Sequence, residues 1–207
     1  DGELKASLLD LARRAGADIS EVQVADASRR TRRDNAYVAG LGATRQVVMF
    51  DNLLERPRAM IESVVAHEIG HWKLGHLKRS LPLALSVLFV NFGLLKVVLE
   101  SRWLLDFAGV DSLRDPAAVP LFALLFPLVA SATGLLNTWL TRAHERDADL
   151  YALELTEDPA SFVEAMRTLH ADNKADLDPP RWRALTMSHP PAAERMAMGD
   201  AWAAATG

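Results

Sequence analysis

Two histidines four residues apart, with a glutamate beside the first, are the residues of this chain best suited to chemistry. His67-Glu68-Ile69-Gly70-His71 is an H-E-x-x-H pentad inside the segment 58–79, which we predict to be helical. Residues four apart share one face of a helix, so the two imidazoles could bind one Zn²⁺ while Glu68 takes a proton from a water molecule at the metal. With six histidines in 207 residues, chance would place such a pentad in roughly one chain in a hundred or fewer. We therefore expect a zinc site rather than two surface histidines.

A catalytic zinc needs a third protein ligand, and the absence of cysteine restricts the choice to histidine or a carboxylate. In one extended motif the third histidine lies six residues beyond the second, but Leu77 occupies that position here. His76 is one residue out of place, and on a continuous helix it should lie well around the axis from His71. We therefore expect the third ligand to come from a second helix.

The best source of that ligand is the segment 142–149, which reads Arg-Ala-His-Glu-Arg-Asp-Ala-Asp. Glu145 and Asp149 are four apart and share a face, so Glu145 could bind the metal while Asp149 accepts a hydrogen bond from the far nitrogen of a ligating histidine. His144 is a competing ligand on a different face from Asp149. An ordinary charged helix face has the same spacing, so the spacing alone leaves the choice open.

Two long apolar stretches separate the pentad from this second segment. Leu81–Leu99 contains one charge, Lys96, and Pro116–Thr141 contains none across 26 positions. A bilayer core is crossed by about 20 helical residues, so we expect transmembrane helices at 81–99 and 118–140. The alternative is a soluble peptidase with both helices buried, but a chain of this size would rarely surround two such helices.

The charges flanking these stretches predict an orientation. Lys73, Lys78 and Arg79 precede the first stretch, and Arg142 and Arg146 follow the second. The connection 100–115 carries a net charge of −2. Lysine and arginine favour the cytoplasmic side, so we expect a hairpin whose outer ends, and with them both metal-binding segments, lie on that side.

The remaining sequence predicts a mainly α chain of the α+β class. A small antiparallel sheet should precede the pentad, and the helical hairpin should be inserted between the H-E-x-x-H helix and the glutamate helix. The expected strands are 21–27, 36–41 and 46–50, and the other expected helices are 3–15, 137–156, 160–172 and 190–205. We expect one domain over 1–207, with further spans preceding it in the whole protein.

With these features the chain resembles a known family, the membrane-embedded zinc endopeptidases that include the type I CAAX prenyl proteases and the HtpX quality-control proteases. Trp72, Lys73 and His76 are closer to the CAAX prenyl protease branch. The matching stretches are Asn35-Ala36-Tyr37, Val47–Leu53, His67–His76, Glu145–Asp149 and Ser188–Arg195. In this order they span nearly the whole chain, and the chain should be the catalytic C-terminal portion.

The resemblance implies a zincin-like catalytic domain with one Zn²⁺ per chain and a role for each matching residue. The metal ligands would be His67, His71 and Glu145; Glu68 would be the general base and His189 would stabilise the oxyanion; Asp149 would support the ligands and Arg195 would hold the His189 turn; Asn35, Ala36 and Tyr37 would bind substrate backbone.

The function expected from these observations is a zinc-dependent membrane endopeptidase similar to the CAAX prenyl proteases. Its partners would be a peptide or protein substrate and a lipid bilayer; the net charge of −4 gives no indication of nucleic acid. A composition rich in Ala, Arg and Leu is typical of a bacterium with GC-rich DNA, so we expect an integral protein of a bacterial inner membrane with its active site on the cytoplasmic side. The alternatives are an HtpX-like quality-control protease and a non-catalytic membrane binding protein stabilised by zinc, which would have no use for Glu68.

Overall fold

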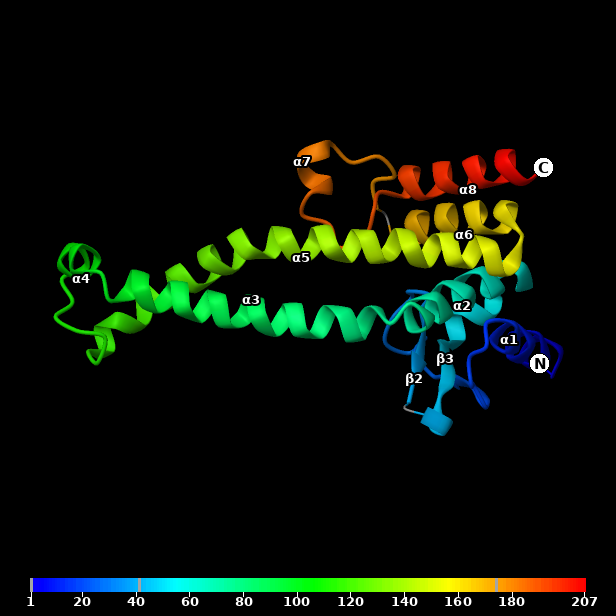
Figure 1. Cartoon of the computed structure of the whole chain (residues 1–207), viewed down its shortest axis with the longest axis horizontal. Helices are drawn as coiled ribbons and strands as arrows, with labels where there is room; N and C mark the ends of the chain where they lie inside the picture. Colours follow the sequence, from blue (N-terminus) through cyan, green and yellow to red (C-terminus); the bar gives the residue numbers. More distant parts are fainter. Residues whose placement is uncertain (1, 41, 174) are drawn as a thin grey trace. The chain divides into compact units, whose positions relative to one another are not determined.

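The computed structural model describes residues 2–40, 42–173 and 175–207, which form two compact units (Figure 1). One unit contains the chain up to His76 and again from Thr141 onward, and the other contains Leu77–Leu140. The first unit holds every residue that the sequence singled out for chemistry.

The first unit begins with the amphipathic helix α1 (Gly2–Arg14). Leu8 and Leu11 on its apolar stripe are buried, as the spacing predicts, and the helix packs against the helix that carries the pentad. Gly16 ends it in the left-handed conformation, with φ at +65°, and its amide donates to the Arg13 carbonyl.

Three short strands, β1 (Glu21–Ala25), β2 (Ala36–Ala39) and β3 (Gln46–Phe50), form one sheet in the order β1-β3-β2. β2 and β3 pair in antiparallel fashion through a short turn in which Gly40 has φ of +88°. β1 runs parallel to β3, so the expectation of an antiparallel sheet is wrong for this pair. The β2–β3 hairpin occupies one side of β3. β1, which a longer segment connects to β2, therefore pairs with the other side of β3. β2 is thereby left at an edge of the sheet; Leu41, the last residue of the strand expected there, lies outside the described residues.

The pentad lies on α2 (Arg58–Lys73), which begins after Pro57 as expected. The predicted continuation of this helix to Arg79 is wrong, because Gly75 adopts φ of +67° and ends it. A new helix, α3 (His76–Leu99), starts with the next residue. His76 therefore does not lie where a continuous helix would put it.

The second segment expected to bind the metal lies on α5 (Val119–Thr156), which continues without a break from the second apolar stretch. It is followed by α6 (Pro159–Asp172), α7 (Arg181–Ala184) and α8 (Ala192–Thr206). Within the first unit, α2 packs against α1, β2 and α6, and α8 covers α6 (Figure 1). α2 is thus the central element, and the core around it includes the fully buried Val65, Ile69 and Leu153.

The second unit contains the greater part of α3, the short helix α4 (Arg102–Ala108) and the first part of α5. Among the described residues, two helical stretches are long and apolar enough to cross a membrane: His76–Leu99 with mean hydropathy 2.0 and Pro116–Thr156 with 2.1. Only 11% of the most apolar window of the first and none of the second is buried, which is unlike the core helices of a soluble protein. Thr133 Oγ1 donates to Asn91 Oδ1 at 2.7 Å, a polar contact between α3 and α5 inside this unit.

Candidate metal centre

The side chains of His67, His71 and Glu145, from α2 and α5, converge on one point, which we call the metal point. His67 and His71 lie one turn apart on α2, with their Nε2 atoms 3.0 Å apart. Glu145 on α5 places Oε2 3.4 Å from His67 Nε2 and Oε1 3.3 Å from His71 Nε2. The structure therefore brings together the three predicted ligands, and His144 is not a member of this group.

The chemistry of this donor set fits a metal ion. Two imidazoles and one carboxylate are a common protein ligand set of catalytic zinc, which keeps a further position open. Glu145 is 5% exposed, and its Oε2 atom is buried without a hydrogen bond from any described residue. A buried carboxylate oxygen without a donor is costly, and a cation at this point would satisfy it.

Behind His67 lies a buried ion pair. Asp149, which is 0% exposed, places Oδ1 2.8 Å from His67 Nδ1, so the nitrogen that faces away from the metal point has a carboxylate acceptor. Arg195 of α8 donates from Nε to Asp149 Oδ2 at 2.7 Å. This pairing gives the buried Asp149 carboxylate a countercharge, and the expected role of Arg195 in holding the His189 turn stays a prediction.

Behind His71 lie two further histidines. His76 Nδ1 is 2.9 Å from His71 Nδ1, and the His76 ring stacks on His144 with centroids 4.3 Å apart and planes 8° apart. The expectation that His76 lies away from His71 is wrong, because Gly75 ends α2 and the chain turns back. Gly75 was the sequence signal for this break.

The charges around the metal point alter the ionisation of its residues in the metal-free protein. Burial opposes a charge on His67, but the nearby Asp149 and Glu145 carboxylates outweigh it and raise the pKa of His67 from 6.5 to about 9. Burial also opposes a charge on Glu145, yet His67 and His71 hold its pKa well below the usual value. The pKa of Asp149 is lowered in the same way, since Arg195 and His67 outweigh its burial.

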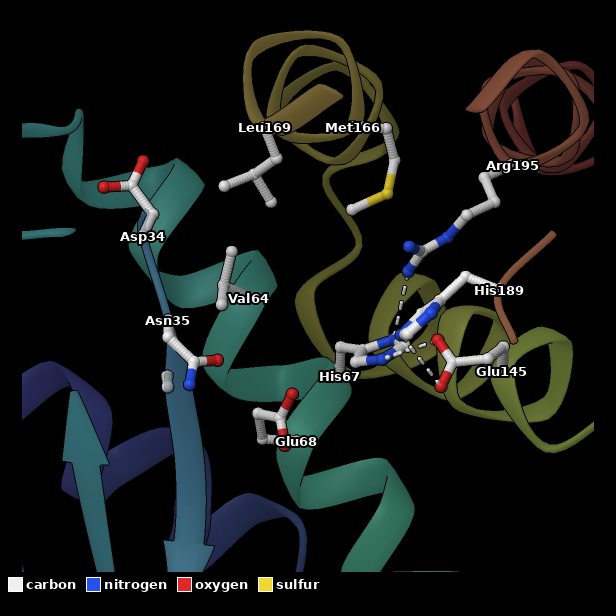
Figure 2. A pocket seen from close by; sticks show the side chains of 11 residues that line it. Asp34, Asn35, Val64, His67, Glu68, Glu145, Met166, Leu169, His189 and Arg195 are labelled. Atoms are coloured by element: carbon white, nitrogen blue, oxygen red, sulfur yellow. Dashed lines mark hydrogen bonds and ion pairs between the residues drawn. The ribbon is translucent and has the colours of Figure 1, made fainter. Parts of the chain in front are cut away.

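The metal point opens into a cavity of about 130 Å³. Glu68 from α2, Asn35 just before β2 and Ala36 at the start of β2 all line it (Figure 2). Burial raises the pKa of the Glu68 carboxyl, which moves it toward the range useful for a general base. Glu68 is therefore beside the triad without being part of it.

His189 lies in the segment just before α8 and also lines the cavity. Its Nε2 is 3.6 Å from Glu145 Oε1, while Nδ1 is 2.8 Å from the Ser188 hydroxyl. Partial burial in the cleft lowers the pKa of His189. The ring thus faces the metal point from the side opposite α2 (Figure 2).

Tyr37 is not brought to the cavity. It is the next residue along β2 after Ala36, its side chain is 41% exposed, and successive strand residues point to opposite faces. Conversely, Val64, Met166 and Leu169 form an apolar wall of the cavity that the sequence analysis missed. α6 supplies the last two, and nothing in its sequence distinguishes them from ordinary core residues.

Comparison with known proteins agrees with this geometry. Residues 1–203 match peptidase family M48, and the chain belongs to this family. It is 29% identical over 198 residues to an uncharacterized metalloprotease, YhfN, of Bacillus subtilis, covering 94% of this chain and 46% of the relative. It is 30% identical over 219 residues to the CAAX prenyl protease 1 of Saccharomyces cerevisiae, covering 97% of this chain and 48% of the relative.

A solved structure is also similar. The crystal structure of S. mikatae Ste24p superposes with a TM-score of 0.80 at 28% identity, over 97% of this chain and 50% of that one. The predicted fold class and the closeness to the CAAX prenyl protease branch are thereby confirmed. The chain spans about half the length of these relatives.

Proposed function

We propose that this chain is the catalytic part of a zinc-dependent membrane endopeptidase that resembles the CAAX prenyl proteases. The observation that carries the proposal is the convergence of His67, His71 and Glu145 on one point, with the Glu68 carboxylate beside it in the same cavity. Membership of peptidase family M48 supports a metal-dependent cleavage of peptide bonds.

The chemistry divides among the residues that line the cavity. A zinc ion held by the triad would polarise a water molecule and the scissile carbonyl. Glu68 takes a proton from the attacking water and later delivers it to the leaving nitrogen, which its raised pKa favours. His189 donates a hydrogen bond to the oxygen that gains charge in the transition state. Asp149 and Arg195 keep His67 in the orientation and tautomer that metal binding requires.

The substrate peptide binds along β2. This strand is at an edge of the sheet, and Asn35 and Ala36 at its start line the cavity beside Glu68. An extended peptide added to such an edge gains main-chain hydrogen bonds and presents alternate side chains to the enzyme. Asn35 holds substrate backbone, and the scissile bond then lies between β2 and the metal point.

We further propose that the protein lies in a bacterial inner membrane with its active site on the cytoplasmic side. α3 and the first part of α5 form the hairpin that crosses the bilayer, which their length and hydropathy support. The basic residues that flank both spans favour cytoplasmic outer ends, and these ends carry the metal-binding segments.

The decisive experiment is the substitution Glu68→Gln in the zinc-loaded protein, assayed in detergent with a general peptidase substrate. We expect cleavage to fall about 100- to 10,000-fold because the general base is lost, with the zinc content unchanged. Glu164→Gln, at an exposed position of α6 with 58% of its side chain accessible, is the matched control and should leave both values unchanged. Unaltered turnover in Glu68→Gln would end the assignment.

Metal removal separates catalysis from a purely structural metal site. Chelation should abolish cleavage while the metal-free protein still unfolds cooperatively, because the core around α2 does not include the metal point. Complete unfolding on chelation would favour the non-catalytic, zinc-stabilised membrane protein instead.

A further inference from the structure

His71 has one ring nitrogen left once the other is assigned to the metal. Its Nε2 faces His67 and Glu145 at 3.0 and 3.3 Å, so Nε2 is the metal-binding atom if the proposed function holds. A neutral imidazole that binds a metal through Nε2 carries its proton on Nδ1, which needs an acceptor when it is buried. The atom found there is His76 Nδ1, at 2.9 Å.

We propose that His76 is a positioning residue for the metal site, its Nδ1 accepting a hydrogen bond from the Nδ1–H of His71, and that His144 holds the His76 ring in place by stacking. This goes beyond the proposed function, which assigns no role to either histidine, and it rests on that function for the assignment of His71 as a ligand.

The position of His76 is defined from two directions. Gly75, with φ of +67°, turns the chain so that His76 begins α3 directly against His71, with ring centroids 4.9 Å apart and planes at 78°. On its other side the ring lies parallel to His144, which is adjacent in sequence to the ligand Glu145. His76 and His144 are only 4% and 7% exposed, so neither ring can turn freely toward solvent.

This arrangement fixes the tautomers. With His71 donating from Nδ1, His76 accepts at Nδ1 and carries its own proton on Nε2. The His71 ring is then held at both ends, by the metal at Nε2 and by His76 at Nδ1. Because His144 and Glu145 are neighbours on α5, the same helix that supplies the third ligand also supports the orientation of the second.

Two substitutions at position 76 separate the hydrogen bond from packing. His76→Phe keeps an aromatic ring for His144 to stack on but offers no acceptor, and His76→Asn keeps an acceptor oxygen close to the place of Nδ1 but removes the ring. We expect the zinc affinity, measured by competition with a chromophoric chelator, to fall about 10- to 100-fold in His76→Phe. His76→Asn should remain about tenfold closer to the unsubstituted chain. The reverse order would show that His76 acts by packing and would overturn the proposal.

His144 has its own matched pair of variants. His144→Phe keeps the stacking ring and should leave the zinc affinity and stoichiometry unchanged, whereas His144→Ala should weaken zinc binding in the same direction as His76→Phe. Loss of bound zinc in His144→Phe, as in Glu145→Gln, would make His144 a ligand and overturn the proposal. Thermal unfolding of each metal-free variant shows whether the compared proteins are folded.

A measurement on the unsubstituted chain does not depend on any variant folding. In the zinc-loaded protein, ¹⁵N-labelled histidine should show His71 protonated at Nδ1 and His76 protonated at Nε2. A protonated His76 Nδ1 would overturn the proposal. None of these measurements involves cleavage, so the two proposals can fail separately. If Glu68→Gln did not abolish turnover, the proposed function would be wrong. If His76→Phe bound zinc with normal affinity, only the role of His76 would be wrong.

Discussion

His67 and His71 lie on successive turns of the same helix and face the same point, yet their surroundings differ. The far nitrogen of His67 meets a fully buried carboxylate, Asp149, which is itself paired with Arg195. The far nitrogen of His71 meets another imidazole, His76, which stacks on His144. The first histidine is supported by an ion pair and the second by imidazole rings.

This difference separates two tasks that a metal site requires of its outer residues. A carboxylate behind His67 orients the ring and also stabilises its protonated form in the metal-free protein, so it couples metal binding to pH. In the tautomers proposed above, the rings behind His71 orient it without adding charge to the site. The pH response and the largest energetic penalties should therefore arise on the His67 side.

The largest effect is expected from Asp149→Ala. This change leaves the Arg195 guanidinium, 7% exposed, without its countercharge and removes the acceptor for His67. Breaking a buried ion pair from one side destabilises proteins by about 3–5 kcal/mol. Denaturant unfolding of the metal-free protein should show this loss, and zinc affinity should fall with it.

The control for Asp149→Ala removes the charge of both partners. Asp149→Leu combined with Arg195→Met should recover most of the unfolding free energy, because apolar pairs replace buried ion pairs at little energetic penalty, but it should not recover zinc affinity. A smaller destabilisation by Asp149→Ala than by His76→Ala would contradict the contrast between the two sides.

A second expectation concerns the dependence of zinc affinity on pH. The pKa of His67 is about 9 in the metal-free protein, so below this pH zinc must displace a proton from His67. The apparent association constant should then rise by about tenfold per pH unit between about pH 6.5 and 8. Asp149→Asn should flatten this slope, because it removes the charge that stabilises protonated His67, whereas His76→Asn should leave the slope unchanged.

The metal-free protein should respond to pH in the opposite direction. The folded pKa of His67 lies above its ordinary value of 6.5, so protonation of this residue stabilises the folded state fully below pH 6.5, and this contribution is lost as the pH rises through about 9. Unfolding free energy without metal should fall over this range while zinc affinity rises. If the unfolding free energy and the zinc affinity changed with pH in the same direction, His67 would not be the residue that exchanges the proton.

The convergence of the candidate metal ligands could be predicted from sequence because their chemistry depends on local spacing. The four-residue separations of His67 from His71 and of Glu145 from Asp149 each place two side chains on one helix face, and resemblance to a family joined the two helices. The distances between Glu145 and both histidines agree with that combination. The apolar stretches could be predicted equally well, because length and hydropathy suffice to identify them.

The contacts that could not be predicted from the sequence depend on tertiary packing or on one backbone angle. The parallel pairing of β1 with β3 is not encoded by alternation within either strand. The contact of His76 with His71 depends on the left-handed conformation of Gly75, which converts a continuous helical pattern into two helices. The pairing of Arg195 with Asp149 depends on where α8 packs.

The smallest effect is expected at Gly70, between the two histidines, where α2 and α5 lie close together. A Cβ atom at this position would lie 3.2 Å from the Ala148 carbonyl oxygen and 3.2 Å from Tyr151 Cδ1, so Gly70→Ala forces α5 away by a few tenths of an ångström. Alanine also gains about 0.5–1 kcal/mol of helix propensity, which offsets the strain in the unfolding free energy.

The proposed zinc site has no such compensation. Glu145, Asp149 and His144 all lie on α5 and shift together relative to α2, so Gly70→Ala should weaken zinc binding about two- to fivefold with little change in stability. Gly134→Ala is the control, because a Cβ atom there meets nothing within 4 Å. If Gly70→Ala bound zinc as tightly as the Gly134→Ala variant, the spacing of the two helices at Gly70 would not determine the geometry of either histidine. The distinct surroundings of His67 and His71 would then have to be maintained by the side chains alone.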